Sequence, residues 1–276
     1  MEFKDKVIAF VDILGWKNLV QRAESGVGLP LPELVALLDC FGTGKERDAF
    51  EKNGPQCCPV AAYDAPNLDF RLTQVSDCAI VSAEVSPAGV INLINHCWRS
   101  VYRFLEHGIM TRGYIKLGTV HHDERHILGT GYHETFAAER NVTAFKLEAD
   151  ERGTPFVQID PAVVTYVEHC NDSCVKTMFS RMTRSDAGIA ALFPFQRIKH
   201  HLIPEQPGGV GLLSRQRQSN RNVQRTIHRY KALVESLVDL SNPDAVRKSR
   251  HYSAALDRQL KVCDETDAAI NRLGGV

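Results

Sequence analysis

Two aspartates, Asp12 and Asp77, occupy positions from which they could bind metal ions. Asp12 follows the apolar run 7–11 in "KVIAFVDILGWKNLV", and Gly15 ends that run. Asp77 lies in the turn "VSDC" between two segments of strand-like composition. Carboxylates at close range repel one another unless a cation neutralises them, and Mg²⁺ and Mn²⁺ favour such oxygen ligands. The two residues can instead be a helix cap and a turn former, which are common structural roles of aspartate.

The hydrophobic pattern around these aspartates predicts a sheet with helices packed against it. We expect a strand at about 6–13, a hairpin with Asp77 in its turn, and a long strand at about 109–120. A helix with one apolar face is expected at about 88–107. Because strand pairs alternate with single helices, we predict an α+β fold close to the ferredoxin-like pattern, covered on one face. Such a sheet would bring Asp12 and Asp77 to one edge.

The rest of the chain is expected to hold loops, short elements and two long helices. Residues 41–66 are rich in Gly, Pro, Asn and Asp and are interpreted as a loop. A helix is expected at about 132–149. After the linker-like stretch "EQPGGVG" (205–211), the pattern is helical and polar at about 220–240 and 243–273. We therefore divide the chain into a domain of residues 1–204 and a helical C-terminal extension of residues 205–276.

Composition limits the classes of protein to which the chain can belong. The 276 residues include 33 Lys and Arg against 33 Asp and Glu, so we expect no membrane and no nucleic acid as partners. No apolar run approaches the roughly 18 residues of a membrane span, and the charged start "MEFKDK" does not resemble a secretory signal. Cys170 and Cys174 form a close pair without a second half, and the eight cysteines suggest no disulfide framework. A reduced, cytoplasmic protein is therefore expected.

Three motifs in this order, "FVDILGW", "VSDCAIVS" and "RGYIKLGTV", resemble the catalytic domain of class III nucleotidyl cyclases. That family has an F-x-D-I-x-G-F motif on its first strand, a second metal-binding Asp in a hairpin and an R-x-G-I-x-x-G-x-V strand. Arg112, Ile115, Gly118 and Val120 fit the last motif, and Tyr114 replaces one of its glycines. The resemblance covers about residues 5–160.

The resemblance implies a reaction and a set of site residues. Asp12 and Asp77 would hold two Mn²⁺ or Mg²⁺ ions per site, and the backbone carbonyl of Ile13 would bind one of them. The segment from Phe10 to Gly15 would line the triphosphate of a nucleoside triphosphate. The ribose 3′-oxygen would attack the α-phosphate, and pyrophosphate would leave.

Class III active sites form between two catalytic domains, so the resemblance also implies a head-to-tail homodimer with two equivalent sites. Its interface would use the sheet face opposite the helices. Arg112, Tyr114 and Lys116 alternate onto one face of their strand. We expect this polar face to contact substrate or a partner subunit; plain exposure to solvent is the alternative.

The residues that would read the base differ from those of purine cyclases. Thr73 stands where those enzymes carry a base-reading Lys, four residues before the second Asp. In "VTAFKLE", Lys146 and Val142 stand at the family's Arg and Asn positions, and Asn141 is one residue away. These departures fit either lost activity or a different base. The stand-alone pyrimidine cyclases of bacterial Pycsar antiphage defence resemble this chain most, in their short DILG-type motif, S-D hairpin and extra C-terminal region.

The resemblance therefore predicts a cytoplasmic enzyme that converts UTP to 3′,5′-cyclic UMP and pyrophosphate. The product would activate a separate effector protein in antiviral signalling. CTP, giving cyclic CMP, is the alternative substrate, followed by a purine nucleotide. The rival from another class is a catalytically inactive regulator that binds nucleotide or nucleic acid through the basic segment 215–231.

Overall fold

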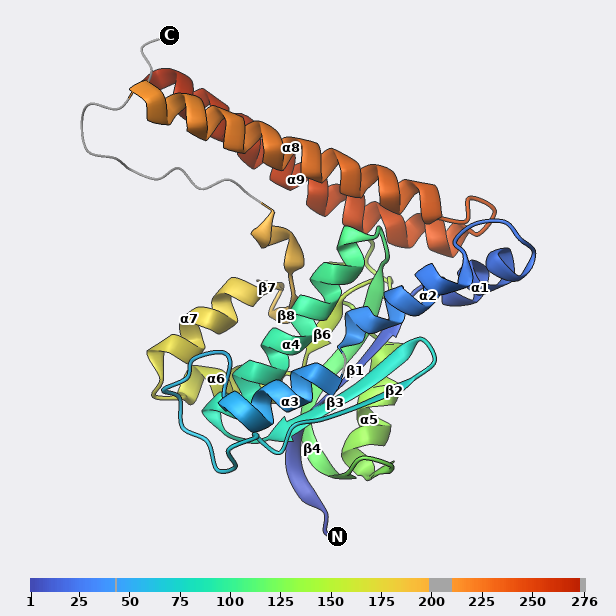
Figure 1. The fold of residues 1–276 in the computed structure, drawn as a ribbon, viewed down its shortest axis with the longest axis vertical. Coiled ribbons are helices and arrows are strands. Elements are labelled where there is room, and N and C mark those ends of the chain that lie inside the picture. The colour runs from blue at the N-terminus through green and yellow to red at the C-terminus, as the bar shows by residue number, and fades with distance from the viewer. Residues whose placement is uncertain (43, 199–209, 274–276) are drawn as a thin grey trace.

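Strand β1 lies inside the sheet and pairs with β3 on one side and β4 on the other. A computed structural model describes residues 1–42, 44–198 and 210–273, and its sheet has the order β2-β3-β1-β4-β6-β8-β7, with β5 paired to β4. Figure 1 shows this sheet beneath two long helices. The strands are β1 (Lys4–Ile13), β2 (Arg71–Val75), β3 (Cys78–Glu84), β4 (Thr111–His122), β5 (Ile127–Leu128), β6 (Val157–Ile159), β7 (Thr183–Asp186) and β8 (Ile189–Leu192).

The first four strands of the path, β2-β3-β1-β4, are antiparallel throughout, and β6 joins β4 in parallel. This order and its helical connections confirm the predicted α+β, ferredoxin-like pattern. The helices are α1 (Trp16–Glu24), α2 (Leu31–Leu38), α3 (Gly44–Asn53), α4 (Pro87–Glu106), α5 (Thr130–Glu139), α6 (Pro161–His169), α7 (Ser173–Met182), α8 (Val210–Leu237) and α9 (Pro243–Leu273), with short 3₁₀ turns at Asp39–Phe41 and Pro194–Arg197.

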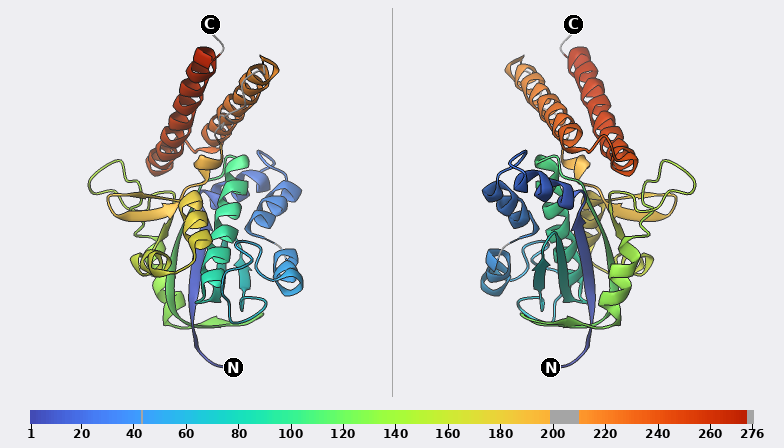
Figure 2. Two further views of the ribbon diagram at one scale, coloured as in Figure 1. Left: turned by 90° about the vertical axis from the view of Figure 1, so that its left-hand side faces the viewer. Right: turned by 90° about the vertical axis from the view of Figure 1, so that its right-hand side faces the viewer.

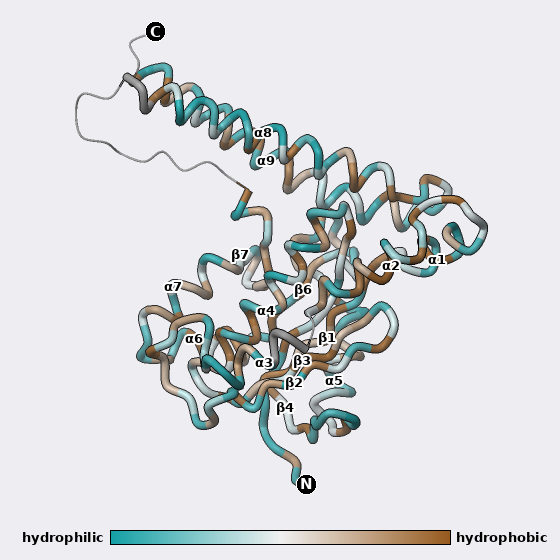
Figure 3. The backbone as a smooth tube through the Cα atoms, in the orientation of Figure 1, coloured by the Kyte–Doolittle hydropathy of each residue, from teal (hydrophilic) through white to brown (hydrophobic). Residues whose placement is uncertain are grey.

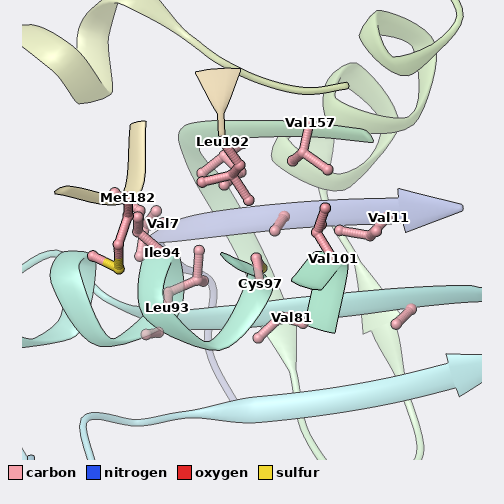
Figure 4. Close-up of a cluster of buried hydrophobic side chains, with 14 of the residues drawn as sticks. Val7, Val11, Val81, Leu93, Ile94, Cys97, Val101, Val157, Met182 and Leu192 are labelled. Atoms are coloured by element: carbon pink, nitrogen blue, oxygen red, sulfur yellow. The ribbon is translucent and has the colours of Figure 1, made fainter. Parts of the chain in front are cut away.

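One face of the sheet packs on α4. Alternate residues of β1, namely Val7, Ala9 and Val11, point to this face and are buried. Leu93 and Ile94 of α4 belong to the same cluster of side chains (Figure 4). Burial of this apolar surface holds β1 in place, and with it the residues at the end of the strand.

The opposite face of the sheet is partly covered by α5. Phe136 of α5 meets Phe10 of β1 edge-to-face, with ring centroids 5.1 Å apart. The helix can lie close to β4 because Gly118 and Gly131 face each other: a Cβ at Gly118 would lie 2.7 Å from the Cα of Gly131. The prediction that helices cover one face only is therefore wrong. Part of the face expected to form a dimer interface is occupied by α5.

The long helices α8 and α9 pack against each other, and one end of this hairpin rests on the sheet (Figures 1 and 2). Tyr252 of α9 is buried, and its hydroxyl accepts a hydrogen bond from the N–H of Thr111 at 3.3 Å. Along both helices hydrophilic and hydrophobic residues alternate (Figure 3). The two predicted helices are confirmed, although α8 begins earlier than expected. The proposed boundary at 204/205 lies outside the described residues.

Several elements differ from the sequence prediction. Helix α3 lies inside the segment expected to be a loop, and α7, β7 and β8 were not predicted. Helix α5 ends at Glu139 and not near 149, because the chain then turns to bury Val142, whose carbonyl accepts a hydrogen bond from Thr154 N–H. The helix that would have carried the family's Arg and Asn positions is therefore a loop.

The structure joins Cys58 to Cys174 by a disulfide bond across 116 positions of sequence, and the other six cysteines form no disulfide bond. The expectation that no cysteines pair is therefore wrong for these two. Cys58 lies in the loop after α3 and Cys174 in the first turn of α7. Because spacing along the chain does not reveal which loop meets which helix, the pair could not be foreseen. In the described ranges, no helix has both the length and the apolar character needed to cross a membrane.

The close approach of α5 to β4 gives a stability prediction. Gly118→Ala should lower the free energy of unfolding by about 1–3 kcal/mol, because the added methyl group would press on the backbone of Gly131. Urea titration followed by circular dichroism measures the change. Thr119→Ala, at an exposed neighbouring position, is the control and should cost less than about 1 kcal/mol. Equal losses in both variants would contradict the tight contact.

Candidate active site

The pairing of β1 sets the position of both candidate aspartates. In register, Asp12 lies between Cys78 of β3 and Arg112 of β4. Asp77 occupies the β2–β3 turn, and its backbone carbonyl accepts a hydrogen bond of 3.0 Å from the N–H of Ile13. The turn is therefore attached directly to the residue after Asp12, and the two aspartates lie at the same end of the sheet.

A third carboxylate, Glu139, completes this group of acids. It is the last residue of α5, it is buried, and it forms an ion pair with the guanidinium of Arg112. We call Asp12, Asp77 and Glu139 the acid cluster. Arg112 lies on the same sheet face as Asp12, as strand alternation predicts. The polar face of β4 thus contacts side chains of the protein itself, including Glu139.

The electrostatics of the cluster centre on Asp12. Burial, followed by the charges of Glu139 and Asp77, raises the pKa of Asp12 to about 7, although Arg112 and Lys248 act in the opposite direction. The pKa of the adjacent Cys78 thiol is raised to about 11 by burial and by the same three carboxylates. The site therefore has more negative charge than its own cations can balance, which favours binding of a proton or a metal ion.

A small cavity lies where β1 leads into α1, just after Asp12 in the chain, and no residue of the acid cluster lines it. Its volume is about 140 Å³, and its walls include Leu14, Gly15 and Asn18 on one side and Lys248 of α9 on the other. Gly15 has a φ of 80°, in the left-handed region that favours glycine, and it precedes the first turn of α1. A side chain at this position would meet no atom within 4 Å, so the approach to the backbone is open.

The remaining predicted site residues are spread over several parts of the structure. Phe10 and Ile13 are buried beside Asp12 in β1. The hydroxyl of Thr73 is 2.9 Å from Nε2 of His122, farther along the β2–β3 hairpin. Lys146 is exposed in the loop after α5, where its ammonium donates to the carbonyl of Ala149. The structure thus brings Asp12, Asp77 and Arg112 together, whereas the described hydrogen bond of Lys146 is to Ala149 and not to any of these three residues.

Two residues of the site, Glu139 and Lys248, were missed by the sequence analysis. Glu139 lies four residues after Thr135 on one face of α5, but only the packing of that helix shows that both side chains are buried. No local signal marks Lys248, which reaches the cluster only through the packing of α9. Within the part of the chain that the structure describes, no group of three or more His, Cys, Asp or Glu side chains is arranged to hold a metal ion alone.

Comparisons with known proteins place cyclase domains among the structural neighbours. No family model and no curated protein matches the chain. The guanylyl cyclase Cya2 is 13% identical, with a TM-score of 0.37 over 69% of this chain and 92% of its own. A bacterial light-regulated adenylyl cyclase is 16% identical, with a TM-score of 0.39 over 62% of this chain and 47% of its own. A dimeric guanylyl cyclase domain of the RhoGC fusion protein, from the aquatic fungus Blastocladiella emersonii, is 11% identical, with a TM-score of 0.37 over 61% of this chain and 86% of its own.

These identities and scores describe a distant likeness. We therefore infer a function from the residues of the site and not from these neighbours.

The raised pKa of Asp12 predicts a pH-dependent stability. Because this pKa of about 7 lies above the ordinary aspartate value of 3.8, the folded chain binds more protons than the unfolded chain between about pH 4 and pH 7. The free energy of unfolding therefore falls as pH rises through that window. Without divalent ions at pH 8, Asp12→Asn should be more stable than the parent by about 1–2 kcal/mol, a figure reduced for solvent screening. Urea titrations from pH 4 to pH 8 measure this. Asp186→Asn, at the exposed last residue of β7, should retain the parent's dependence of stability on pH.

Proposed function

We propose that the protein is a nucleotide cyclase whose acid cluster binds divalent metal ions together with a nucleoside triphosphate. The observation that carries this proposal is the placement of Asp12 and Asp77 at one end of the sheet, where Asp12 has a pKa raised to about 7. A buried carboxylate crowded by like charges gains most from a bound cation. The motif order that resembles class III cyclases supports the same assignment.

The donor set fits Mn²⁺ or Mg²⁺, with two ions per site. Asp12 and Asp77 supply carboxylate oxygens, and Ile13 supplies a backbone carbonyl, which are the ligand types that hard cations prefer. Phosphate oxygens of the substrate would complete the coordination, consistent with a cluster that does not suffice for a metal ion by itself. When bound, such ions lower the pKa of an attacking hydroxyl and stabilise charge on phosphoryl oxygens.

The residues of the chain itself have separate roles in this proposal. The segment from Phe10 to Gly15 faces the phosphates with backbone groups, and the open approach at Gly15 leaves room for them. Arg112 is bound to Glu139, which fixes the side chain on the polar sheet face. The ribose 3′-hydroxyl gives its proton to water and its oxygen attacks the α-phosphorus. The bond from that phosphorus to the bridging oxygen breaks, and pyrophosphate leaves.

The proposed substrate is UTP, and the proposed product is 3′,5′-cyclic UMP, which would act on a separate effector in antiphage defence. Support comes from Thr73 at the position where purine cyclases carry lysine. Its hydroxyl is bound to His122, so this part of the site offers an uncharged polar edge in place of a cation. An uncharged polar edge suits a pyrimidine base but does not distinguish uracil from cytosine, so CTP is the alternative substrate. The homodimer and the cytoplasmic location remain part of the proposal.

A regulator without catalytic activity is the second candidate, and one feature of α8 favours it. Arg221, Arg225 and Arg229 follow one another at four-residue spacing and are exposed. Such a basic face on a helix can contact the phosphates of a nucleic acid.

Incubation with each of the four nucleoside triphosphates and Mn²⁺ tests the proposed function. We expect pyrophosphate release with UTP, and mass spectrometry should identify cyclic UMP. Asp12→Ala or Asp77→Ala should reduce the rate at least a hundredfold, because each removes a ligand of the ions that activate the hydroxyl. Asp186→Ala, which removes an exposed turn aspartate far from the cluster in the strand order, should retain the parent rate.

Two results would redirect the assignment. Cyclic CMP as the main product would support the assignment as a cyclase and identify CTP as its substrate. No cyclic product from any of the four nucleotides, together with retained nucleotide or nucleic-acid binding, would favour the regulator.

A further inference from the structure

The cavity that follows Asp12 along the chain, at Leu14 and Gly15, has a second wall that belongs to α9 and the turn before it. Asn242, Asp244 and Lys248 line this wall, opposite Gly15 and Asn18. Asn242 caps the first turn of α9, because its side-chain oxygen accepts hydrogen bonds from the N–H groups of Asp244 and Ala245. The C-terminal hairpin therefore encloses the place where, under the proposed function, the phosphates lie.

Lys248 is the cation of this wall. Its ammonium is 2.6 Å from the carboxylate of Asp244, and its side chain is 14% exposed. Asp244 also forms an ion pair with Arg247. The carboxylate would therefore keep one cationic partner if the lysine moved away. A lysine side chain has four flexible bonds and three donors, so it can exchange a carboxylate for a phosphate without backbone movement.

The neighbouring residues of α9 fix the base of this lysine. One helical turn along, Tyr252 is bound to the backbone of Thr111, and His251 lies 2.7 Å from the carboxylate of Glu151 in a fully buried pair. Thr111 itself lies opposite Ile13, the residue after Asp12, in the β1–β4 register. These contacts attach the α9 backbone to the acid-cluster end of the sheet, so Lys248 starts from a defined position.

We propose that Lys248 is a phosphate-binding residue, which leaves Asp244 and binds the triphosphate when a nucleotide occupies the cavity between α1 and α9. This inference rests on the proposed function for the location of the phosphates, and it adds to the site a residue from the C-terminal extension. Such a cation is needed near the acid cluster. Metal ions would offset the charge of the aspartates, but a triphosphate would add further negative charge. Arg112 is already engaged by Glu139, and Lys146 is directed to Ala149.

Binding of inorganic tripolyphosphate in the presence of Mg²⁺, measured by calorimetry on the full chain, tests the proposal without catalysis. Lys248→Met keeps the length of the side chain and removes its charge, and we expect tripolyphosphate to bind about ten- to a hundredfold more weakly. Lys248→Arg should retain binding within about threefold, since it preserves the charge. Lys261→Met, at an exposed position of the same helix, is the matched control and should bind as the parent does.

The nucleotide assay provides the second readout. We expect Lys248→Met to raise KM for the nucleotide more than it lowers kcat, with a melting temperature close to that of the parent. Unchanged tripolyphosphate binding in Lys248→Met would overturn the proposal. It would also be overturned if tripolyphosphate binding were weakened equally in Lys248→Met and Lys248→Arg and both variants had a lowered melting temperature. A parent chain that binds tripolyphosphate through Lys248 but makes no cyclic nucleotide would sustain this inference and reject the proposed function. Cyclisation that is unaffected by Lys248→Met would sustain the proposed function and reject this inference.

Discussion

The pairing of β1 on both edges brings carboxylates together at the end of the strand, and the rest of the site depends on this constraint. The N–H of Ile13 is bound to the backbone of Asp77, and Arg112 is in register with Asp12. Neither aspartate can be moved away without breaking ladder hydrogen bonds or uncovering the apolar face that packs on α4. The sheet thus holds like charges close together, and the raised pKa of Asp12 is the result.

Helices from distant parts of the sequence then complete the site around this constraint. The end of α5 brings Glu139 against Arg112, because two glycines allow that helix to lie on β4. The first turns of α9 bring Lys248 to the far side of the small cavity. Although the C-terminal helices read as an extension in the sequence, Tyr252 and His251 attach α9 to the same end of the sheet.

Local pattern was sufficient to predict the elements that carry the two aspartates. The apolar run before Asp12 and the segments on either side of the turn at Asp77 were predicted as strands, and they pair as strands in the structure. The ferredoxin-like order then follows from the connections between them. Glu139 and Lys248 were missed because their roles depend on how α5 and α9 pack. The same reason explains the disulfide between Cys58 and Cys174 and the early end of α5, where burial of Val142 prevails over helical pattern.

Crystals grown with Mn²⁺ and a non-reactive UTP analogue, measured at the manganese absorption edge, test the central claim most directly. We expect two anomalous peaks at each site, in contact with the carboxylates of Asp12 and Asp77 and with the phosphates of the analogue. Peaks bound elsewhere, or an analogue whose phosphates lie away from the end of β1, would contradict it.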